Sequence, residues 1–260
     1  MAWTDIRDGN PLKRALAAGE VAVGSFVRIP SAESVEVCAA AGCDFVVIDT
    51  EHAALPDDGA ALVRAADAAG TVSIVRTVGT SREIITRALD TGAGGVQIPQ
   101  LRSVAQAEAA IAATRYLGGT RGTASNRRSG FGLRIPVAEY VRAADAHTVV
   151  VLQVEDRSGL DAADEIGLMP GYDVLFAGVS DLAVALGVPG DWDNPVFTKA
   201  LERIRDAALA GGKVFGVPVG SVPLAARYME MGARFIATGD LGMLGAATRG
   251  FVDGVRECSA

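Results

Sequence analysis

The sequence predicts an α/β fold of the (β/α)8 class, a TIM barrel formed by residues 1–260 as a single domain. Eight short apolar segments rich in β-branched residues alternate with helix-like segments along most of the chain. Hydrophobic residues make up 50% of the sequence and aromatic residues only 5%, which favours close packing of helices on a sheet over a β-sandwich. The length of 260 residues is also typical of one such barrel.

Each expected unit has the same order: apolar strand, polar loop, capping residue, helix and terminating glycine. Ser81, for example, is expected to cap a helix that reaches Asp90 and stops before Gly92. The expected strands lie at residues 21–27, 45–49, 72–75, 95–98, 149–154, 174–177, 214–217 and 235–237. The expected helices lie at residues 32–41, 57–69, 81–90, 103–114, 137–146, 160–166, 195–210, 223–231 and 241–256.

A doubly wound open sheet is the alternative fold. Against it, no GxGxxG or GxxxxGK[ST] motif follows the first strand, and the last strand–helix unit is as regular as the others. Residues 117–136, rich in glycine and arginine, interrupt the alternation and are expected to form an elaborated loop. The last helix could pack on its own barrel or on that of a neighbouring subunit, and the sequence leaves both options open.

Charge and cysteine content restrict the classes of partner and compartment. The net charge of −7 and the pI of about 4.9 disfavour nucleic acid and anionic membranes as partners of the whole surface. The 3 cysteines form no metal-binding spacing and are typical of buried thiols in a reducing cytosol. The amino terminus lacks the order of a signal peptide, and no apolar run reaches membrane-spanning length. We therefore expect a soluble, cytoplasmic protein.

The first candidate for a functional site is the end of the second expected strand. The apolar run Phe45–Ile48 leads directly into Asp49, Glu51 and His52. The chain has only 2 histidines, so one beside two acids at a strand end indicates function. The competing interpretation is an ordinary polar loop, because acids and histidines are common in loops.

The other expected strands also end in polar residues. In a TIM barrel the carboxyl ends of all strands meet at one mouth, which carries the active site. Acids, amides, one arginine and one histidine are therefore expected to converge there, namely Asp49, Glu51, His52, Arg76, Gln97, Gln153, Glu155, Ser180 and Asp181.

Two carboxylates and one arginine carry the chemical interpretation. Glu155 and Asp181, brought together on neighbouring strand ends, would repel unless a cation lay between them, and oxygen ligands suit Mg²⁺ or Mn²⁺. Alternatively, Glu155 pairs with Arg157 and Asp181 caps a helix that begins at Leu182. Arg76 would need a carboxylate partner, either a substrate or the neighbouring Asp49.

Several other chemistries are disfavoured. Schiff-base catalysis needs a lysine at the mouth, and none of the lysines, Lys13, Lys199 and Lys213, is expected there. No GxSxG nucleophile elbow occurs, and a zinc site with one histidine would lack ligands. The arginines around the elaborated loop could attract an anionic substrate or belong to a solvated, charge-balancing loop; they are Arg115, Arg121, Arg127, Arg128 and Arg134.

A colinear set of motifs between residues 24 and 247 resembles the HpcH/HpaI aldolase family. The matching segments are Asp49-Thr50-Glu51-His52, Val75-Arg76, residues 89–100, Arg121-Gly122, Gln153-Val154-Glu155 and Gly178-Val179-Ser180-Asp181-Leu182. The resemblance implies a metal-dependent, class II pyruvate aldolase with a modified TIM barrel. It also implies a hexamer, a trimer of dimers, whose last helix is exchanged between subunits.

The resemblance assigns roles by position. Glu155 and Asp181 match the metal ligands, for Mg²⁺, Mn²⁺ or Co²⁺, Arg76 matches the residue that holds the pyruvate oxygen, and His52 matches the acid/base residue. Asp49 and Asp90 match a supporting polar network. Gln153, Gly178, Val179 and Ser180 match the pyruvate-binding surface. Val179 and Pro218 depart from the usual family residues, which leaves the aldehyde undefined.

The implied reaction is reversible cleavage of a 4-hydroxy-2-oxo acid to pyruvate and an aldehyde through a pyruvate enolate. The same site could instead serve an oxaloacetate decarboxylase or a macrophomate-synthase-like enzyme. A barrel retained only for ligand binding is the non-enzymatic alternative, and it predicts the loss of a key group. The sequence retains all four: Glu155, Asp181, Arg76 and His52.

Overall fold

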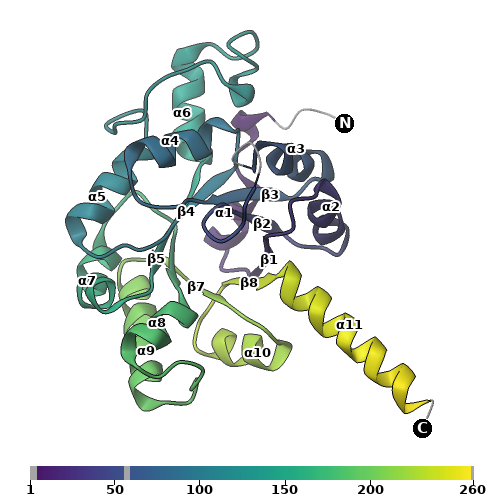
Figure 1. The fold of residues 1–260 in the computed structure, drawn as a ribbon. Coiled ribbons are helices and arrows are strands. Elements are labelled where there is room, and N and C mark those ends of the chain that lie inside the picture. Colours follow the sequence, from purple (N-terminus) through teal and green to yellow (C-terminus); the bar gives the residue numbers. More distant parts are fainter. Residues whose placement is uncertain (1–4, 56–58, 259–260) are drawn as a thin grey trace.

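Eight parallel strands close into a barrel in strict chain order in the computed structural model, which describes residues 5–55 and 59–258 (Figure 1). This confirms the expected (β/α)8 fold. The strands are β1 (Ala22–Val27), β2 (Phe45–Asp49), β3 (Val72–Arg76), β4 (Gly95–Ile98), β5 (Val149–Val154), β6 (Val174–Ala177), β7 (Val214–Pro218) and β8 (Phe235–Gly239).

Helices surround the barrel and differ from the expected ones mainly at their ends (Figure 1). They are α1 (Pro11–Ala17), α2 (Ala32–Ala40), α3 (Ala60–Ala69), α4 (Arg82–Asp90), α5 (Val104–Ala113), α6 (Val137–His147), α7 (Arg157–Leu168), α8 (Val179–Leu186), α9 (Pro195–Ala210), α10 (Val222–Glu230) and α11 (Asp240–Glu257). The described residues also form the short 3-10 turns η1 (Ile6–Asp8) and η3 (Arg127–Ser129). The sequence did not predict α1, and the predicted helix start at residue 57 lies outside the described residues.

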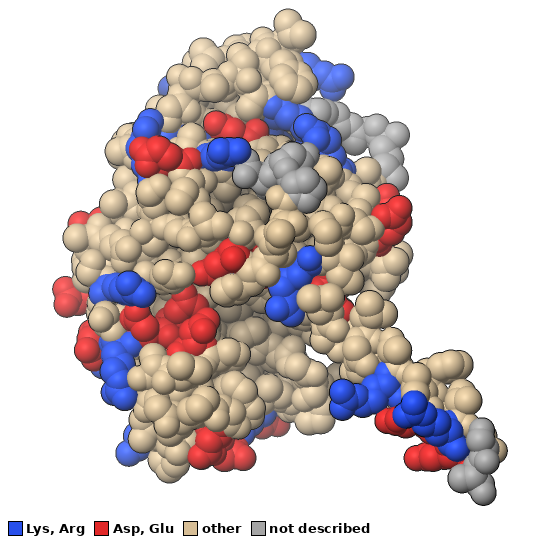
Figure 2. Space-filling model, in the orientation of Figure 1, with Lys and Arg blue, Asp and Glu red and all other residues tan. Residues whose placement is uncertain are grey.

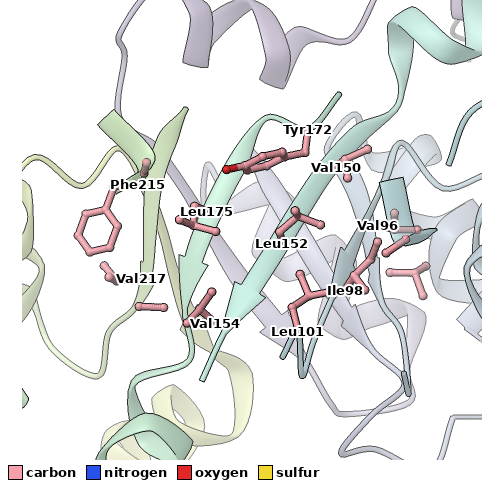
Figure 3. Packing of buried hydrophobic residues seen from close by; sticks show 14 of the residues in the cluster. Val96, Ile98, Leu101, Val150, Leu152, Val154, Tyr172, Leu175, Phe215 and Val217 are labelled. Atoms are coloured by element: carbon pink, nitrogen blue, oxygen red, sulfur yellow. The ribbon is translucent and has the colours of Figure 1, made fainter. Parts of the chain in front are cut away.

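Alternation along the strands divides the core into two layers. Phe45 and Val47 of β2 pack inside the barrel, whereas Val46 and Ile48 pack outside it, against the helices. The outer layer is continuous over β4 to β7, where Figure 3 shows its aliphatic side chains between strands and helices. Because side chains alternate with a period of two, the residue after Ile48 points inward again. Asp49 therefore enters the interior at the carboxyl end of the barrel.

The amino-terminal helix α1 closes the opposite end of the barrel. Its Leu12 and Leu16 are buried in the inner layer. Asn10 caps α1 and also donates its side-chain amide to the carbonyl oxygens of Gly94 and His147, at 3.1 and 3.0 Å. Helix α1 therefore covers this end of the barrel interior, whereas polar residues at the carboxyl ends of the strands line a cavity.

The arginines of the elaborated loop are structural. Arg127 and Arg128 pair with Asp67 of α3, and the Arg121 guanidinium lies 4.3 Å from the ring centre of Tyr116. The loop follows the end of α5, which places it at the amino-terminal end of the barrel, and none of its arginines lines the cavity at the mouth. Solvation was therefore wrong for Arg121 and Arg128, which are buried, whereas the pairing of Arg127 and Arg128 with Asp67 agrees with a charge-balancing role.

The last helix, α11, projects away from the barrel (Figure 1). Its residues from Leu241 onward are exposed through Cys258, and they include Leu244 at 57% and Phe251 at 75% exposure. Charged groups line one side of the projecting helix and uncharged atoms the other (Figure 2). None of the helices in residues 5–55 and 59–258 has the length and apolar content needed to cross a membrane.

Candidate active site

A cavity of about 540 Å³ opens at the carboxyl ends of the strands. Inward-pointing residues of β2, β3 and β5 form its polar side, namely Asp49, Arg76 and Gln153, and His52 follows β2. Val179, Trp192, Val219, Leu224 and Tyr228 form its largely apolar side. The predicted convergence of strand-end residues on one mouth is therefore observed for this set.

Arg76 is held in place by two carboxylates. Its Nε donates to Asp49 Oδ1 at 2.9 Å and its Nη2 to Asp49 Oδ2 at 2.5 Å, which makes the pair bidentate. Its Nη1 lies 3.4 Å from Glu51 Oε2. Its guanidinium carbon also lies 4.7 Å from the ring centre of Phe26. The alternative of a salt bridge to Asp49 is thus correct, and the bridge fixes the guanidinium at the cavity wall.

Asp49 also fixes the loop that carries His52. It is 0% exposed, and its Oδ1 accepts hydrogen bonds from the backbone N–H groups of Glu51 and His52, both at 3.2 Å. The imidazole Nε2 of His52 lies 3.7 Å from Glu51 Oε2, and its side chain is 52% exposed. Asp49 thus positions the backbone of His52, and Glu51 is the carboxylate nearest its ring. This leaves the imidazole free to face a ligand in the cavity.

Glu155 is a buried carboxylate at the end of β5, only 6% exposed. Its Oε1 accepts from the backbone N–H of Gln100 at 2.7 Å, and its Oε2 accepts from the Gln153 side-chain amide. Burial raises the pKa of Glu155 to about 7, the two hydrogen bonds oppose that rise, and the charges of Glu51 and Asp181 add to it. A positive charge placed among these three carboxylates would be strongly favoured.

Asp181 lines the cavity from the first turn of α8. It is not the helix cap: α8 begins at Val179, not at Leu182, and no side-chain hydrogen bond caps it. The alternative partner of Glu155 is also excluded, because Arg157 donates instead to the carbonyl oxygens of Ala185 and Leu186. Both carboxylates are therefore free of the structural roles that competed with metal binding.

The donor set fits a divalent cation held by few protein ligands. In the described part of the chain, no group of three or more His, Cys, Asp or Glu side chains is arranged to hold an ion. Two carboxylates, with water and substrate oxygens completing the shell, are instead the pattern that Mg²⁺ commonly accepts. The charges of Glu51 and Asp181, which raise the pKa of Glu155, favour a cation at this position.

The backbone at the start of α8 closes against Glu155. A Cβ at Gly178 would stand 2.6 Å from Glu155 Oε2 and 3.1 Å from Gln153 Nε2, so only glycine fits here. Gly178, Val179 and Ser180 all line the cavity beside Asp181. The structure thus brings together the predicted binding residues of β5 and α8.

Asp90 lies apart from the other predicted residues. It ends α4, at the amino-terminal end of the barrel, where its Oδ1 lies 3.3 Å from Arg121 Nη2. Within one chain it does not line the cavity. Its role in a supporting network remains a prediction.

Two residues of the mouth were missed by sequence reasoning. Gln100 donates its side-chain amide to Glu51 Oε1 at 2.9 Å and its backbone N–H to Glu155, with a left-handed φ of 57°. Arg28 lines the cavity just after β1. The signal for Arg28 was its spacing, because it continues the inward alternation of Ala22 and Phe26. As expected, the described lining of the cavity contains no lysine.

Comparison with known proteins places this site in a family context. The family model described as HpcH/HpaI aldolase/citrate lyase matches residues 22–246. A 5-keto-4-deoxy-D-glucarate aldolase from Shigella boydii is 36% identical over 250 residues, covering 94% of this chain and 95% of the relative. These matches span nearly the whole barrel, including every residue of the mouth.

Solved structures agree with this comparison. A HpcH/HpaI aldolase/citrate lyase family protein from Burkholderia cenocepacia superposes with a TM-score of 0.89 at 34% identity, covering 95% of this chain and 99% of that one. Macrophomate synthase superposes with a TM-score of 0.86 at 26% identity, covering 98% of this chain and 90% of that one. The barrel fold is thus shared with proteins whose names give more than one activity.

Proposed function

This chain belongs to the HpcH/HpaI aldolase/citrate lyase family and is a lyase of the aldolase type, and from that premise we propose its reaction. It reversibly cleaves a 4-hydroxy-2-oxo acid into pyruvate and an aldehyde. The observation that carries the proposal is the joint placement of fixed Arg76, exposed His52 and two carboxylates, Glu155 and Asp181, around one mouth.

Arg76 stabilises the charge that develops during cleavage. When the C3–C4 bond breaks, its electron pair passes to the C2 carbonyl oxygen and forms the enolate of pyruvate. A guanidinium already oriented by Asp49 and Glu51 can face that oxygen without reorganising during the reaction. The same ion pairs keep Arg76 from moving away when the site is empty of substrate.

His52 handles the proton. As a base, directly or through one water, it removes the proton of the 4-hydroxyl group while the aldehyde forms. Its ring reaches the cavity, and its Nε2 lies 3.7 Å from Glu51 Oε2. A proton then returns to C3 of the enolate and releases pyruvate.

A divalent cation, Mg²⁺ or Mn²⁺ with Co²⁺ as a further option, would be held by Glu155 and Asp181 and would supply positive charge to the oxygens of the 2-oxo acid. Gln153 and the backbone at Gly178 hold Glu155 in a single position for that purpose. The support for this assignment is the buried carboxylate and its two like-charged neighbours.

The deciding experiment measures pyruvate release from a panel of 4-hydroxy-2-oxo acids. We expect release in the presence of Mg²⁺ or Mn²⁺ and its loss after rigorous chelation with EDTA. A separate assay, exchange of the pyruvate methyl protons in D₂O, reports enolate formation without any aldehyde. Absence of both pyruvate release and exchange would refute the proposal.

Likeness to macrophomate synthase supports a second candidate, a decarboxylase that generates the same enolate from oxaloacetate. Arg76 would stabilise the enolate in the same way, but no 4-hydroxyl proton would have to be removed. Substituting His52 with Gln therefore separates the candidates, because it should impair aldol cleavage and spare decarboxylation.

We further propose that α11 packs on a second copy of the chain in a hexamer, a trimer of dimers. The apolar side of the helix, with Leu244 and Phe251, finds no cover within its own barrel. Burying one such large side chain stabilises an interface by roughly 1.5–3 kcal/mol.

The free thiols Cys38, Cys43 and Cys258 support the expectation of a reducing, cytoplasmic compartment.

A further inference from the structure

Arg28 is a cation at the mouth without a counter-charge. Its side chain lines the cavity immediately after β1. Its Nε is buried and has no hydrogen-bond partner, and no carboxylate among residues 5–55 and 59–258 lies within 4.0 Å of its guanidinium. Burying a polar N–H without a partner is costly, so such a group in a binding cavity indicates a missing anionic ligand.

Asp240 contacts the backbone of Arg28, and both of its carboxylate oxygens already accept hydrogen bonds from backbone N–H groups. Asp240, at the start of α11, accepts hydrogen bonds from the backbone N–H groups of Arg28 and Ile29 through Oδ2, at 3.0 and 2.9 Å. Its Oδ1 accepts from the backbone N–H of Leu241 at 2.7 Å. Asp240 therefore anchors the backbone that carries Arg28 and leaves the guanidinium unpaired.

Arg76, the other arginine that lines the cavity, has carboxylate partners, unlike Arg28. It is compensated by Asp49 and Glu51 and is assigned above to the enolate oxygen. A second anionic group on a ligand would thus find its free cation at Arg28. The two arginines divide the cavity into an enolate region and a distal region.

Strand order sets the distance between these regions. In a closed barrel of eight strands, β1 stands across from β5, which ends in Glu155. Arg28 lies instead beside the end of β8, where a Cβ on Gly239 would be 3.8 Å from its Nη2. A substrate whose 2-oxo acid end lies near Glu155 would therefore extend its aldehyde end towards Arg28.

We propose that Arg28 is a specificity-determining residue of this cavity, which binds an anionic group at the far end of the aldehyde half and so discriminates anionic from neutral aldehydes. This inference rests on the aldolase function proposed above. Arginine suits the role because its planar N–H groups match a carboxylate in a bidentate arrangement. The lining near Arg28 offers no other positive charge, since Pro218, Val219, Leu224 and Thr238 are neutral.

The test compares two aldehydes that differ only at the distal carbon. Racemic 2-hydroxy-3-oxopropanoate ends in a carboxylate, and racemic glyceraldehyde ends in a CH₂OH group. We would measure kcat/KM for the addition of pyruvate to each, with wild type and Arg28→Met. We expect Arg28→Met to lower kcat/KM for the anionic aldehyde about 10- to 100-fold, the range for a lost hydrogen bond to a charged group. The value for glyceraldehyde should change less than about threefold by the same reasoning.

Two further variants complete the design. Arg28→Lys keeps a point charge and should retain part of the preference for the anionic aldehyde. Arg64→Met removes the same charge from an exposed position on α3, and should leave both values unchanged. Circular dichroism of each variant checks that the fold is retained, and Arg28→Lys provides the comparison if Arg28→Met does not fold.

Exchange of pyruvate methyl protons separates the two levels of failure. Exchange that persists in Arg28→Met, with loss of the anionic preference, supports the inference. A second outcome is that wild type exchanges these protons and that Arg28→Met and Arg28→Lys still prefer the anionic aldehyde. That outcome overturns the role of Arg28 but not the aldolase function. No exchange and no addition to any aldehyde in wild type overturns the proposed function, and this inference with it.

Discussion

Replacing Arg76 with Met should lower both stability and activity, because the same guanidinium pairs with the buried Asp49 and stabilises the enolate. The substitution removes two hydrogen bonds to Asp49, which is 0% exposed, and the nearby positive charge at Glu51. Breaking one side of a buried ion pair costs roughly 3–5 kcal/mol of unfolding free energy. Loss of stability is therefore expected together with loss of activity, because the bidentate contact to Asp49 is removed as well.

A second substitution separates the two effects. Asn at position 49 removes the unpaired charge and can still accept the backbone N–H groups of Glu51 and His52. The double variant Asp49→Asn/Arg76→Met should therefore recover at least about 2 kcal/mol of the stability lost in Arg76→Met. It should not recover catalysis, and kcat/KM should stay at least about 100-fold below wild type because the enolate loses its fixed cation.

The assay is urea unfolding followed by circular dichroism at one fixed protein concentration, since subunit association also contributes to stability. Arg64→Met, an exposed arginine on α3, is the matched control and should behave like wild type. The reasoning is refuted if Arg76→Met loses less than about 1 kcal/mol, a loss typical of an exposed pair. It is also refuted if the double variant regains activity.

Three further predictions test other parts of the molecule. Glu155→Gln should weaken Mn²⁺ binding, measured by calorimetry, at least about 100-fold, because it removes a charged ligand. The control Glu165→Gln, at an exposed position on α7, should bind Mn²⁺ like wild type. Equal affinities of Glu155→Gln and wild type would exclude Glu155 as a ligand. Burial lowers the pKa of His147 to about 4 from its ordinary 6.5. Between these two pH values the unfolded chain binds a proton at His147 that the folded chain does not, so the free energy of unfolding falls as the pH drops below 6.5. Wild type should thus lose about 2 kcal/mol more than His147→Gln between pH 7 and pH 5, and parallel pH profiles would argue against this. Phe251→Glu should reduce the mass measured by light scattering, whereas Leu133→Glu, exposed at 90% on the loop, should not; an unchanged assembly in Phe251→Glu would contradict packing of α11 on a second copy.

Local sequence patterns predicted most of the fold. The strand at residues 45–49, for example, has the bounds that the apolar run predicts. The errors lie where local signals are weak. Helix α1 is only 7 residues long and was overlooked, although Asn10 caps it and its Leu12 and Leu16 pack inside the barrel. The alternative in which Asp181 caps a helix beginning at Leu182 was wrong, because α8 begins at Val179 and its cap position is Gly178.

The candidate site was predictable in part for the same reason. A strand's carboxyl end and the alternation of its side chains place Asp49, Arg76 and Gln153 in the mouth without any knowledge of the partner strands. Gln100 was not predictable, because its contacts join β2 and β5 through a left-handed residue. The burial of Arg128 and Arg121 was not predictable, because their partners, Asp67 and Asp90, lie on helices distant in sequence.

The sequence by itself thus determined the barrel, the mouth and the chemical types gathered there, because periodicity and strand ends are properties of neighbouring residues. Only the tertiary structure decided which charges are compensated. It pairs Arg76 with Asp49 and Glu51, gives Arg28 no carboxylate partner among the described residues, and places Asp90 at the opposite end of the barrel. The physical reason is that charge compensation depends on distances between side chains from different strands, which no local pattern records.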